Sequence, residues 1–173
     1  MTLNDYLKKA LAEGWATGHF NASESDQFRA ICEAAKELNT IAIIGTSEGE
    51  AKHIGYFEAV ALRDAFRKEL GIPIFLNADH HKSVDAAKKA VDAGYDSIHI
   101  DLSHLSFEEN VKATKEVVDY SKFKNPKITV EGEVGYWVTE SSKIYKEVIK
   151  IPPESLTKPE EAEKFAKATG VHR

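Results

Sequence analysis

Polar side chains follow several of the short apolar runs in this 173-residue chain, and their types are those that hold metal ions and move protons. They are Ser47, Asp79, His80, His81, Asp101, Ser103 and Glu133. An imidazole with several carboxylates suits zinc or a similar divalent ion. Each residue alone has an ordinary structural explanation, since a carboxylate such as Asp79 commonly caps the next helix. The set together predicts a metal site, because carboxylates buried around one axis need a cation or hydrogen bonds to compensate them.

The elements that must position these residues alternate along the chain. Strands are expected at 15–22, 41–44, 73–76, 97–101 and 128–134, and helices at 2–13, 24–38, 55–70, 84–93, a segment from 107 and 157–168. Strand starts near 41, 72, 97 and 128 are the length of a βα unit apart. This pattern predicts a parallel sheet with helices outside it.

The parity of the later strands distinguishes a barrel from a flat sheet. One side carries Ile98, Ile100, Ile128, Val130 and Val134, and the other carries Ser97, His99, Asp101, Thr129, Glu131 and Glu133. Apolar residues toward the helices and polar residues toward a shared centre are typical of a (β/α)8 TIM barrel. Barrel enzymes keep their active sites at the carboxyl ends of the strands, where the polar residues gather. The chain has neither a Gly-x-Gly-x-x-Gly turn nor a Gly-Lys-Ser/Thr phosphate loop, which disfavours dinucleotide and nucleoside triphosphate binding.

Composition excludes several classes of protein. The 23 Lys and Arg residues are outnumbered by 28 Asp and Glu residues, for a formal net charge of -5, so a nucleic-acid partner is not expected. There is no apolar run of about 18 residues and no signal-peptide pattern, so we expect a cytoplasmic protein without a membrane span. Cys32 has no partner for an internal disulfide, and its place in the stripe Phe28, Ile31, Cys32 and Ala35 predicts burial.

Four segments together resemble the class II, zinc-dependent ketose-bisphosphate aldolases of the fructose- and tagatose-bisphosphate type. They are Thr46-Ser-Glu-Gly-Glu-Ala-Lys-His-Ile-Gly55, Ala78-Asp-His-His81, Ile100-Asp-Leu-Ser-His-Leu-Ser-Phe-Glu-Glu-Asn110 and Val130-Glu-Gly-Glu-Val-Gly135. Their order is that of the family, and the resemblance extends from the first helix to the last residue. The family fold is a (β/α)8 barrel, which agrees with the parity argument.

The resemblance implies a role for each matching position. Asp79 matches the catalytic aspartate that exchanges a proton with the C4 hydroxyl, and His80 matches the first of three zinc-binding histidines. Asp101 and Glu133 match positions that hold a second divalent ion or lie beside the catalytic zinc. Ser47 matches a serine that contacts the aldehyde-phosphate half of the substrate. The implied reaction cleaves a ketose 1,6-bisphosphate, most simply fructose 1,6-bisphosphate, to dihydroxyacetone phosphate and glyceraldehyde 3-phosphate.

Two departures from the family pattern stand out. The mobile loop that carries a catalytic glutamate in the family is replaced by Tyr136-Trp-Val-Thr-Glu-Ser-Ser142, in which Glu140 is the candidate. The other two zinc histidines and the phosphate loops follow the sixth and later strands, and His172 comes too early to be one of them. Against a barrel of ~250 residues, the chain is about three βα units short.

Three hypotheses therefore remain open. The chain, taken as one domain over 1–173, is the first five βα units of an aldolase that is active, and expected to be a homodimer, only in its full-length form. As a five-strand piece it would leave the first and fifth strands as open edges. Alternatively, it is a half-barrel binding module or a subunit completed by another chain, which predicts a stable oligomer with both edges covered. A third possibility keeps the barrel and the metal and changes the substrate to tagatose bisphosphate or another phosphorylated ketose.

Overall fold

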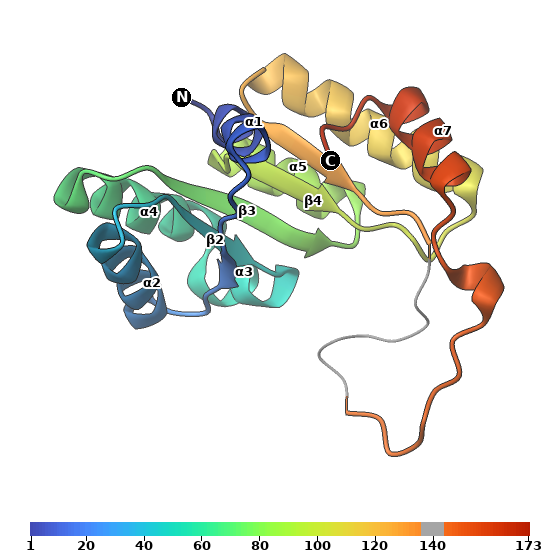
Figure 1. Ribbon diagram of the computed structural model, residues 1–173, viewed down its shortest axis with the longest axis horizontal. Coiled ribbons are helices and arrows are strands. Elements are labelled where there is room, and N and C mark those ends of the chain that lie inside the picture. Colours follow the sequence, from blue (N-terminus) through green and yellow to red (C-terminus); the bar gives the residue numbers. More distant parts are fainter. Residues whose placement is uncertain (136–143) are drawn as a thin grey trace.

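The five expected strands form one parallel sheet in chain order. The computed structural model describes residues 1–135 and 144–173. The strands are β1 (His19–Asn21), β2 (Ala42–Thr46), β3 (Ile74–His81), β4 (Ser97–Ile100) and β5 (Thr129–Gly132), and each pairs with the next (Figure 1). The first and last strands are shorter than the expected 15–22 and 128–134, whereas β3 continues beyond residue 76 to His81. Asp79 and His80 therefore lie within a strand rather than after it.

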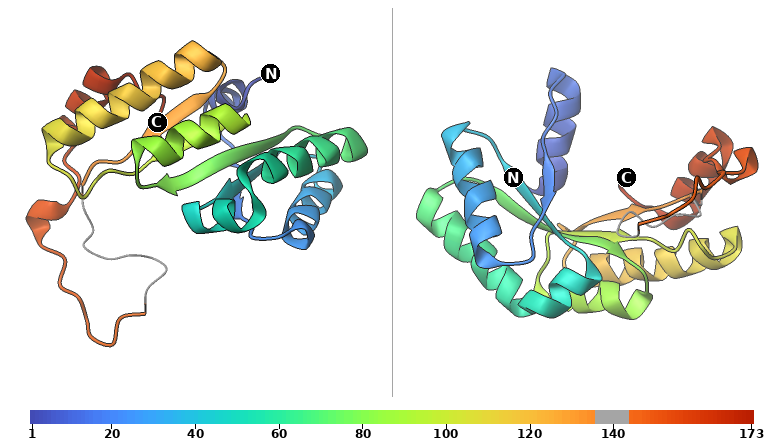
Figure 2. Two further views of the ribbon diagram at one scale, coloured as in Figure 1. Left: turned by 180° about the vertical axis from the view of Figure 1, so that it is seen from behind. Right: turned by 90° about the horizontal axis from the view of Figure 1, so that it is seen from below.

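Helices cover one face of this curved sheet. They are α2 (Ser25–Glu37), α3 (Glu48–Ile54), α4 (Tyr56–Leu70), α5 (Val84–Ala93) and α6 (Phe107–Lys124), followed by a short 3-10 turn, η1 (Pro153–Ser155), and α7 (Pro159–Thr169). α7 packs on α6, where the rings of Phe107 and Phe165 lie 6.2 Å apart (Figures 1 and 2). Alternate strand residues such as Ile44, Leu76 and Ile98 join the helices in the main hydrophobic core. The parity predicted for β4 and β5 is thus confirmed, with Ile98, Ile100 and Val130 on the side of the helices.

α1 (Leu3–Glu13) lies on the opposite face of the sheet from α4 and α5 (Figure 2). Leu3 packs with Ile41, Ile43 and Phe75 in a small separate cluster. These residues come from the amino ends of the strands, so α1 closes that end of the inner face. The spacing of Leu3, Leu7, Ala10 and Leu11 predicts one apolar stripe on this helix, but Leu11 is 86% exposed and takes no part in the packing.

Side-chain caps mark the starts of α1, α3, α5 and α6. Ser83 caps α5, and Ser106 forms a capping box with Glu109 at α6. The sequence Thr157-Lys-Pro-Glu160 has the pattern of a capping box, but that prediction is wrong, because the Thr157 hydroxyl donates to Val134 O and α7 begins at Pro159 without a side-chain cap. The segment Gly45-Thr-Ser-Glu-Gly49, whose composition predicts a loop, instead holds the end of β2 and the start of α3.

The edge at β5 is partly covered, contrary to the expectation of a fully open strand. The N–H of His172 donates to Val130 O (2.8 Å), and the N–H of Gly132 donates to Arg173 O (3.1 Å). The chain after α7 therefore runs beside β5 and follows the order of the sheet. His172 is held by this pairing, as its Nδ1 accepts the N–H of Val130 (3.1 Å).

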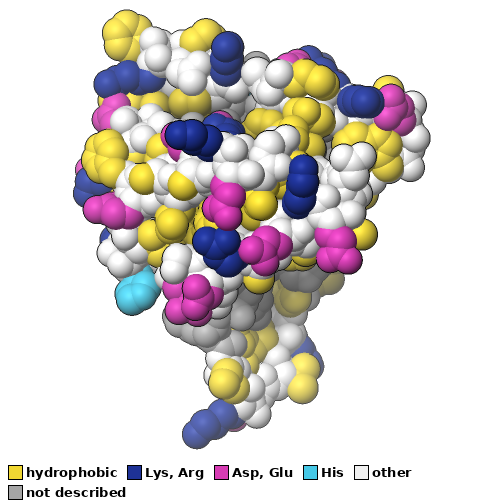
Figure 3. All heavy atoms as spheres, turned by 90° about the vertical axis from the view of Figure 1, so that its left-hand side faces the viewer, with side chains coloured by type: hydrophobic (Ala, Val, Ile, Leu, Met, Phe, Trp, Pro, Cys, Tyr) yellow, Lys and Arg dark blue, Asp and Glu magenta, His cyan; other side chains and the backbone are white. Residues whose placement is uncertain are grey.

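The outer surface agrees with the composition. On the face shown in Figure 3, Lys and Arg side chains are interspersed with Asp and Glu, and no basic patch gathers there. Within the described residues, no helix combines the length and apolarity that crossing a membrane requires.

Candidate metal centre

His80 lies where β3 departs from regular strand geometry. The register between β3 and β4 shifts between Ala78 and His81, and His80 itself has a φ of 44°. A left-handed φ is rare for a residue with a side chain and re-aims that side chain relative to its neighbours. His80 Nδ1 lies 2.9 Å from Asp101 Oδ2 and 3.1 Å from Glu133 Oε2. The irregular strand end thus brings the imidazole of β3 to carboxylates that follow β4 and β5.

His99 on β4 completes this arrangement. Its ring lies 4.1 Å, centroid to centroid, from the ring of His80, and its Nε2 is 3.1 Å from Glu133 Oε2. Its Nδ1 faces Asp79 Oδ1 at 3.9 Å. The alternation of β4 predicts His99 on the polar side, but His99 was not among the predicted site residues. The signal available in the sequence was its position two residues before Asp101 on the same side of the strand.

Asp79 is oriented from the neighbouring strands. The side-chain amide of Asn21, on β1, donates to Asp79 Oδ2 (2.9 Å) and also reaches Glu50 Oε2 (3.0 Å). Burial by itself would raise the pKa of Asp79, but the nearby His99 imidazole and the hydrogen bond from Asn21 outweigh it and hold that pKa well below its usual range. Asp79 is therefore an ionised carboxylate at neutral pH.

Asp101 is almost fully buried and has several hydrogen-bond partners. Its Oδ1 accepts both the N–H (3.2 Å) and the hydroxyl (2.7 Å) of Ser103, and its Oδ2 accepts from His80 and from the Lys82 ammonium. Burial opposes ionisation, yet the bonds from His80, Lys82 and Ser103 lower the pKa of Asp101. The charge is therefore retained in the interior.

Glu133 and His80 stabilise each other's charged forms. Burial would raise the pKa of Glu133, but bonds with His80 and His99 lower it to about 2. Hydrogen bonds with Asp101, which has the larger effect, and with Glu133 raise the pKa of His80 to about 10. Without a bound ion, the positive charge that balances the carboxylates is thus carried by His80 and Lys82.

Ser47 and His81 make structural contacts near this site. Ser47 forms a capping box at α3, where its hydroxyl accepts the N–H of Glu50 (3.3 Å) and its own N–H donates to Glu50 (2.7 Å). Because Glu50 also binds Asn21, Ser47 connects indirectly to Asp79, and its contact with substrate stays a prediction. His81 is fully buried and faces the Tyr56 hydroxyl (3.2 Å), so it is a packed support residue and not a surface one. Glu140 lies outside the described residues.

The donor set fits a divalent ion. One candidate ligand atom each from His80, Asp101 and Glu133 lie within 4.8 Å of one another, and the same holds for Asp79, His80 and His99. Imidazole nitrogen with carboxylate oxygen is a common combination for zinc and related ions. The three residues predicted as metal ligands are therefore brought together, along with Asp79.

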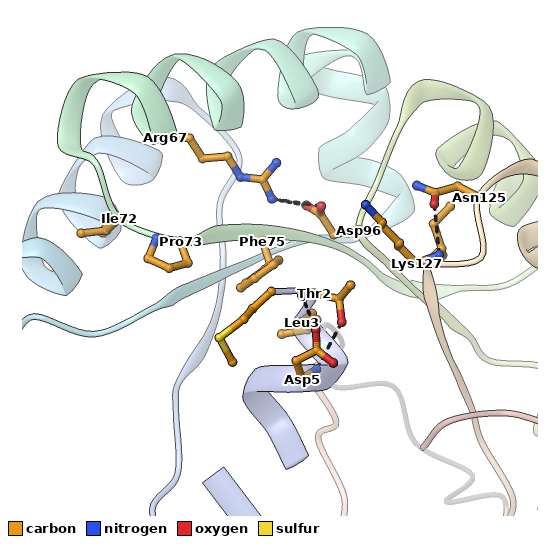
Figure 4. Close-up of a pocket in the computed structure, with 12 residues that line it drawn as sticks. Thr2, Leu3, Asp5, Arg67, Ile72, Pro73, Phe75, Asp96, Asn125 and Lys127 are labelled. Carbon is orange, nitrogen blue, oxygen red and sulfur yellow. Dashed lines mark hydrogen bonds and ion pairs between the residues drawn. The ribbon is translucent and has the colours of Figure 1, made fainter. Parts of the chain in front are cut away.

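A cavity of about 560 Å³ lies at the other end of the sheet (Figure 4). It is bordered by α1 and by the starts of β3 and β5, and Arg67 and Asp96 face each other in it. Those two side chains form a two-point ion pair, with Arg67 Nη2 3.0 Å from each Asp96 oxygen. Its charges are already paired, and in β/α barrels this amino-terminal end contributes stability rather than chemistry.

Sequence comparison matches the whole chain to one family. A profile described as "Fructose-bisphosphate aldolase class-II" matches residues 1–173. The fructose-bisphosphate aldolase of Geobacillus stearothermophilus is 32% identical over 174 residues, covering 99% of this chain and 58% of its own length. That of Staphylococcus aureus (strain Mu50) is 37% identical over 138 residues, covering 78% of this chain and 48% of its own. The chain thus spans about half the length of the curated relatives it matches.

Solved structures show the same fold. The YdjI aldolase of Escherichia coli K12 superposes with a TM-score of 0.76 at 24% identity, covering 99% of this chain and 58% of that one. A fructose-bisphosphate aldolase from Campylobacter jejuni gives a TM-score of 0.78 at 24% identity, covering 97% and 53%. The five-stranded sheet is therefore part of a barrel of this type, and the predicted fold class is confirmed.

Proposed function

Because this chain belongs to the class II fructose-bisphosphate aldolase family, we propose that, within a complete barrel, it cleaves a ketose 1,6-bisphosphate by a metal-dependent retro-aldol reaction. The expected substrate is fructose 1,6-bisphosphate, and the expected products are dihydroxyacetone phosphate and glyceraldehyde 3-phosphate. The observation that carries this proposal is the convergence of His80, Asp101 and Glu133 beside Asp79 at the carboxyl ends of β3 to β5.

The metal would be held by His80 with Asp101 and Glu133 in support. We propose zinc, which when bound acts as a Lewis acid on the substrate carbonyl. His80 must offer a neutral nitrogen to the ion, so a bound cation would replace the proton that the contacts of Nδ1 with Asp101 and Glu133 favour. A catalytic zinc normally takes three protein ligands, and further ligands would come from the rest of the barrel.

Asp79 is the group suited to accept the proton of the substrate hydroxyl. It is ionised at neutral pH, and Asn21 holds its Oδ2, which leaves Oδ1 as the freer oxygen. Oδ1 faces His99 at 3.9 Å, so an imidazole lies nearby to stabilise the carboxylate when it has no proton. Cleavage of the C3–C4 bond requires removal of the C4 hydroxyl proton, which we assign to this atom.

The test uses a completed barrel. It consists of this chain fused to the part of the Geobacillus stearothermophilus relative that the chain does not match. Asp79→Asn keeps the shape and removes the base, so kcat for fructose 1,6-bisphosphate should fall by about 10²–10⁴. Asp92→Asn, on the exposed face of α5 where Asp92 pairs with Lys124 (2.7 Å), is the matched control and should keep kcat.

Circular dichroism establishes first that both variants are folded. Equal cleavage by the Asp79→Asn and unsubstituted barrels would contradict the role of Asp79. Parallel assays with tagatose 1,6-bisphosphate identify the preferred ketose from the ratio of kcat/KM values.

A further inference from the structure

Lys82 brings a positive charge to the carboxylate oxygen that a metal ion would need. Its Nζ contacts Asp101 Oδ2, the same oxygen that lies 2.9 Å from His80 Nδ1. The second oxygen of Asp101 is occupied by the two donors of Ser103. Both oxygens of this buried carboxylate therefore have partners, and one partner of Oδ2 is the ammonium of a half-exposed lysine.

The backbone of Lys82 is fixed while its side chain is not enclosed. Lys82 directly follows β3, and its N–H donates to Glu48 Oε1 (2.6 Å) at the start of α3. Its side chain is 53% exposed, whereas that of Asp101 is 4% exposed. A lysine ammonium on a four-carbon stem can leave such a contact and be hydrated at little steric cost. Lys82 can therefore reach Asp101 from the solvent side and withdraw again.

A divalent ion and the ammonium group compete for the same place. An ion held by His80, Asp101 and Glu133 would approach Oδ2 of Asp101, and two cations on one oxygen repel each other. When no ion is bound, a carboxylate as buried as Asp101 needs a compensating charge, which Lys82 supplies.

We propose that Lys82 is a tethered counterion of the metal centre: it occupies Asp101 in the metal-free protein and is displaced when a divalent ion binds. It thereby sets the affinity for the metal and holds Asp101 in place until the ion arrives. This inference rests on the metal-binding part of the proposed function and is independent of the substrate.

The test measures metal binding by the 173-residue chain without substrate. Isothermal titration with Mn²⁺ and with Zn²⁺ compares the unsubstituted chain with Lys82→Met, which keeps the apolar stem and removes the charge. We expect Lys82→Met to bind about tenfold more tightly, because the lost competitor is one charge-assisted hydrogen bond. Lys82→Arg should leave the affinity close to that of the unsubstituted chain. Lys88→Met is the control, since Lys88 pairs with Glu116 (2.6 Å) on the outer face of α5 and α6.

A second readout follows the metal-free protein. Urea unfolding should show Lys82→Met to be less stable than the unsubstituted chain without metal, and the difference should shrink or reverse at saturating Mn²⁺. Unchanged or weaker metal binding by Lys82→Met overturns the proposal, as does equal tightening by Lys88→Met or the absence of binding by both proteins at millimolar metal. Cleavage assays are not involved, so failure here and failure of the aldolase proposal are distinguishable.

Discussion

At the scale of single residues, most members of the cluster could be predicted from the sequence, but their arrangement could not. Asp79, His80, Asp101 and Glu133 could be selected from their places at strand ends, and the structure brings them together. The inward contact of His80 depends on a left-handed φ and a register shift, which no propensity indicates for a histidine. His99 was not among the predicted site residues, although its ring lies 4.1 Å, centroid to centroid, from that of His80.

Cys32 belongs to this scale as a prediction about reactivity. It is fully buried in α2, and burial raises the pKa of its thiol to about 11. Thiolate is the reactive form, so the native protein should not react with a thiol reagent such as Ellman's reagent at pH 8. One equivalent should react once the chain is unfolded in urea. Rapid labelling of the native protein would contradict the burial of Cys32.

At the scale of elements, the chain's local signals were mostly sufficient. Alternation predicted the parallel strands and their inward faces, whereas α3 was not predicted and residues 45–49 were expected to form a loop. The pattern Ser47-x-x-Glu50 was the available signal, since it forms a capping box at the start of α3. The similar pattern at Thr157 misled, because Pro159 fits the first helical turn and starts α7 by itself.

The pairing of the last residues with β5 should depend on pH. Val130 N–H can only donate, so His172 Nδ1 must be unprotonated to accept it, and burial lowers the pKa of His172 below its usual 6.5. A lowered folded-state pKa contributes stability that is present above pH ~6.5 and is lost as the pH falls through the lower folded-state value.

We therefore expect faster amide exchange at Val130 and Gly132, after correction for the intrinsic pH dependence, when the pH is lowered from 7.5 to 5. His172→Asn keeps an acceptor without titrating and should flatten this dependence. Protection that is independent of pH in the unsubstituted chain would contradict the assignment of the His172 bond.

At the scale of the whole molecule, the chain forms the part of a barrel that carries one wall of the site. α1 closes the amino end of the inner face, and the carboxyl end presents Asp79, His80, Asp101 and Glu133. Within the described residues, β1 pairs with β2 alone, and Phe20 on it is 55% exposed on the side that faces helices elsewhere in the sheet. These are surfaces that the remaining units of a barrel would cover. The chain matches only about half the length of its relatives, which indicates such uncovered surfaces more directly than any local sequence pattern.

The central claim is that these residues serve a metal-dependent cleavage, and the most direct measurement is the rate of fructose 1,6-bisphosphate cleavage by the completed barrel before and after metal removal. We expect cleavage to disappear with a chelator and return when Zn²⁺ is added, while the 173-residue chain alone stays inactive throughout. Cleavage by the completed barrel that persists after exhaustive metal removal would contradict the account.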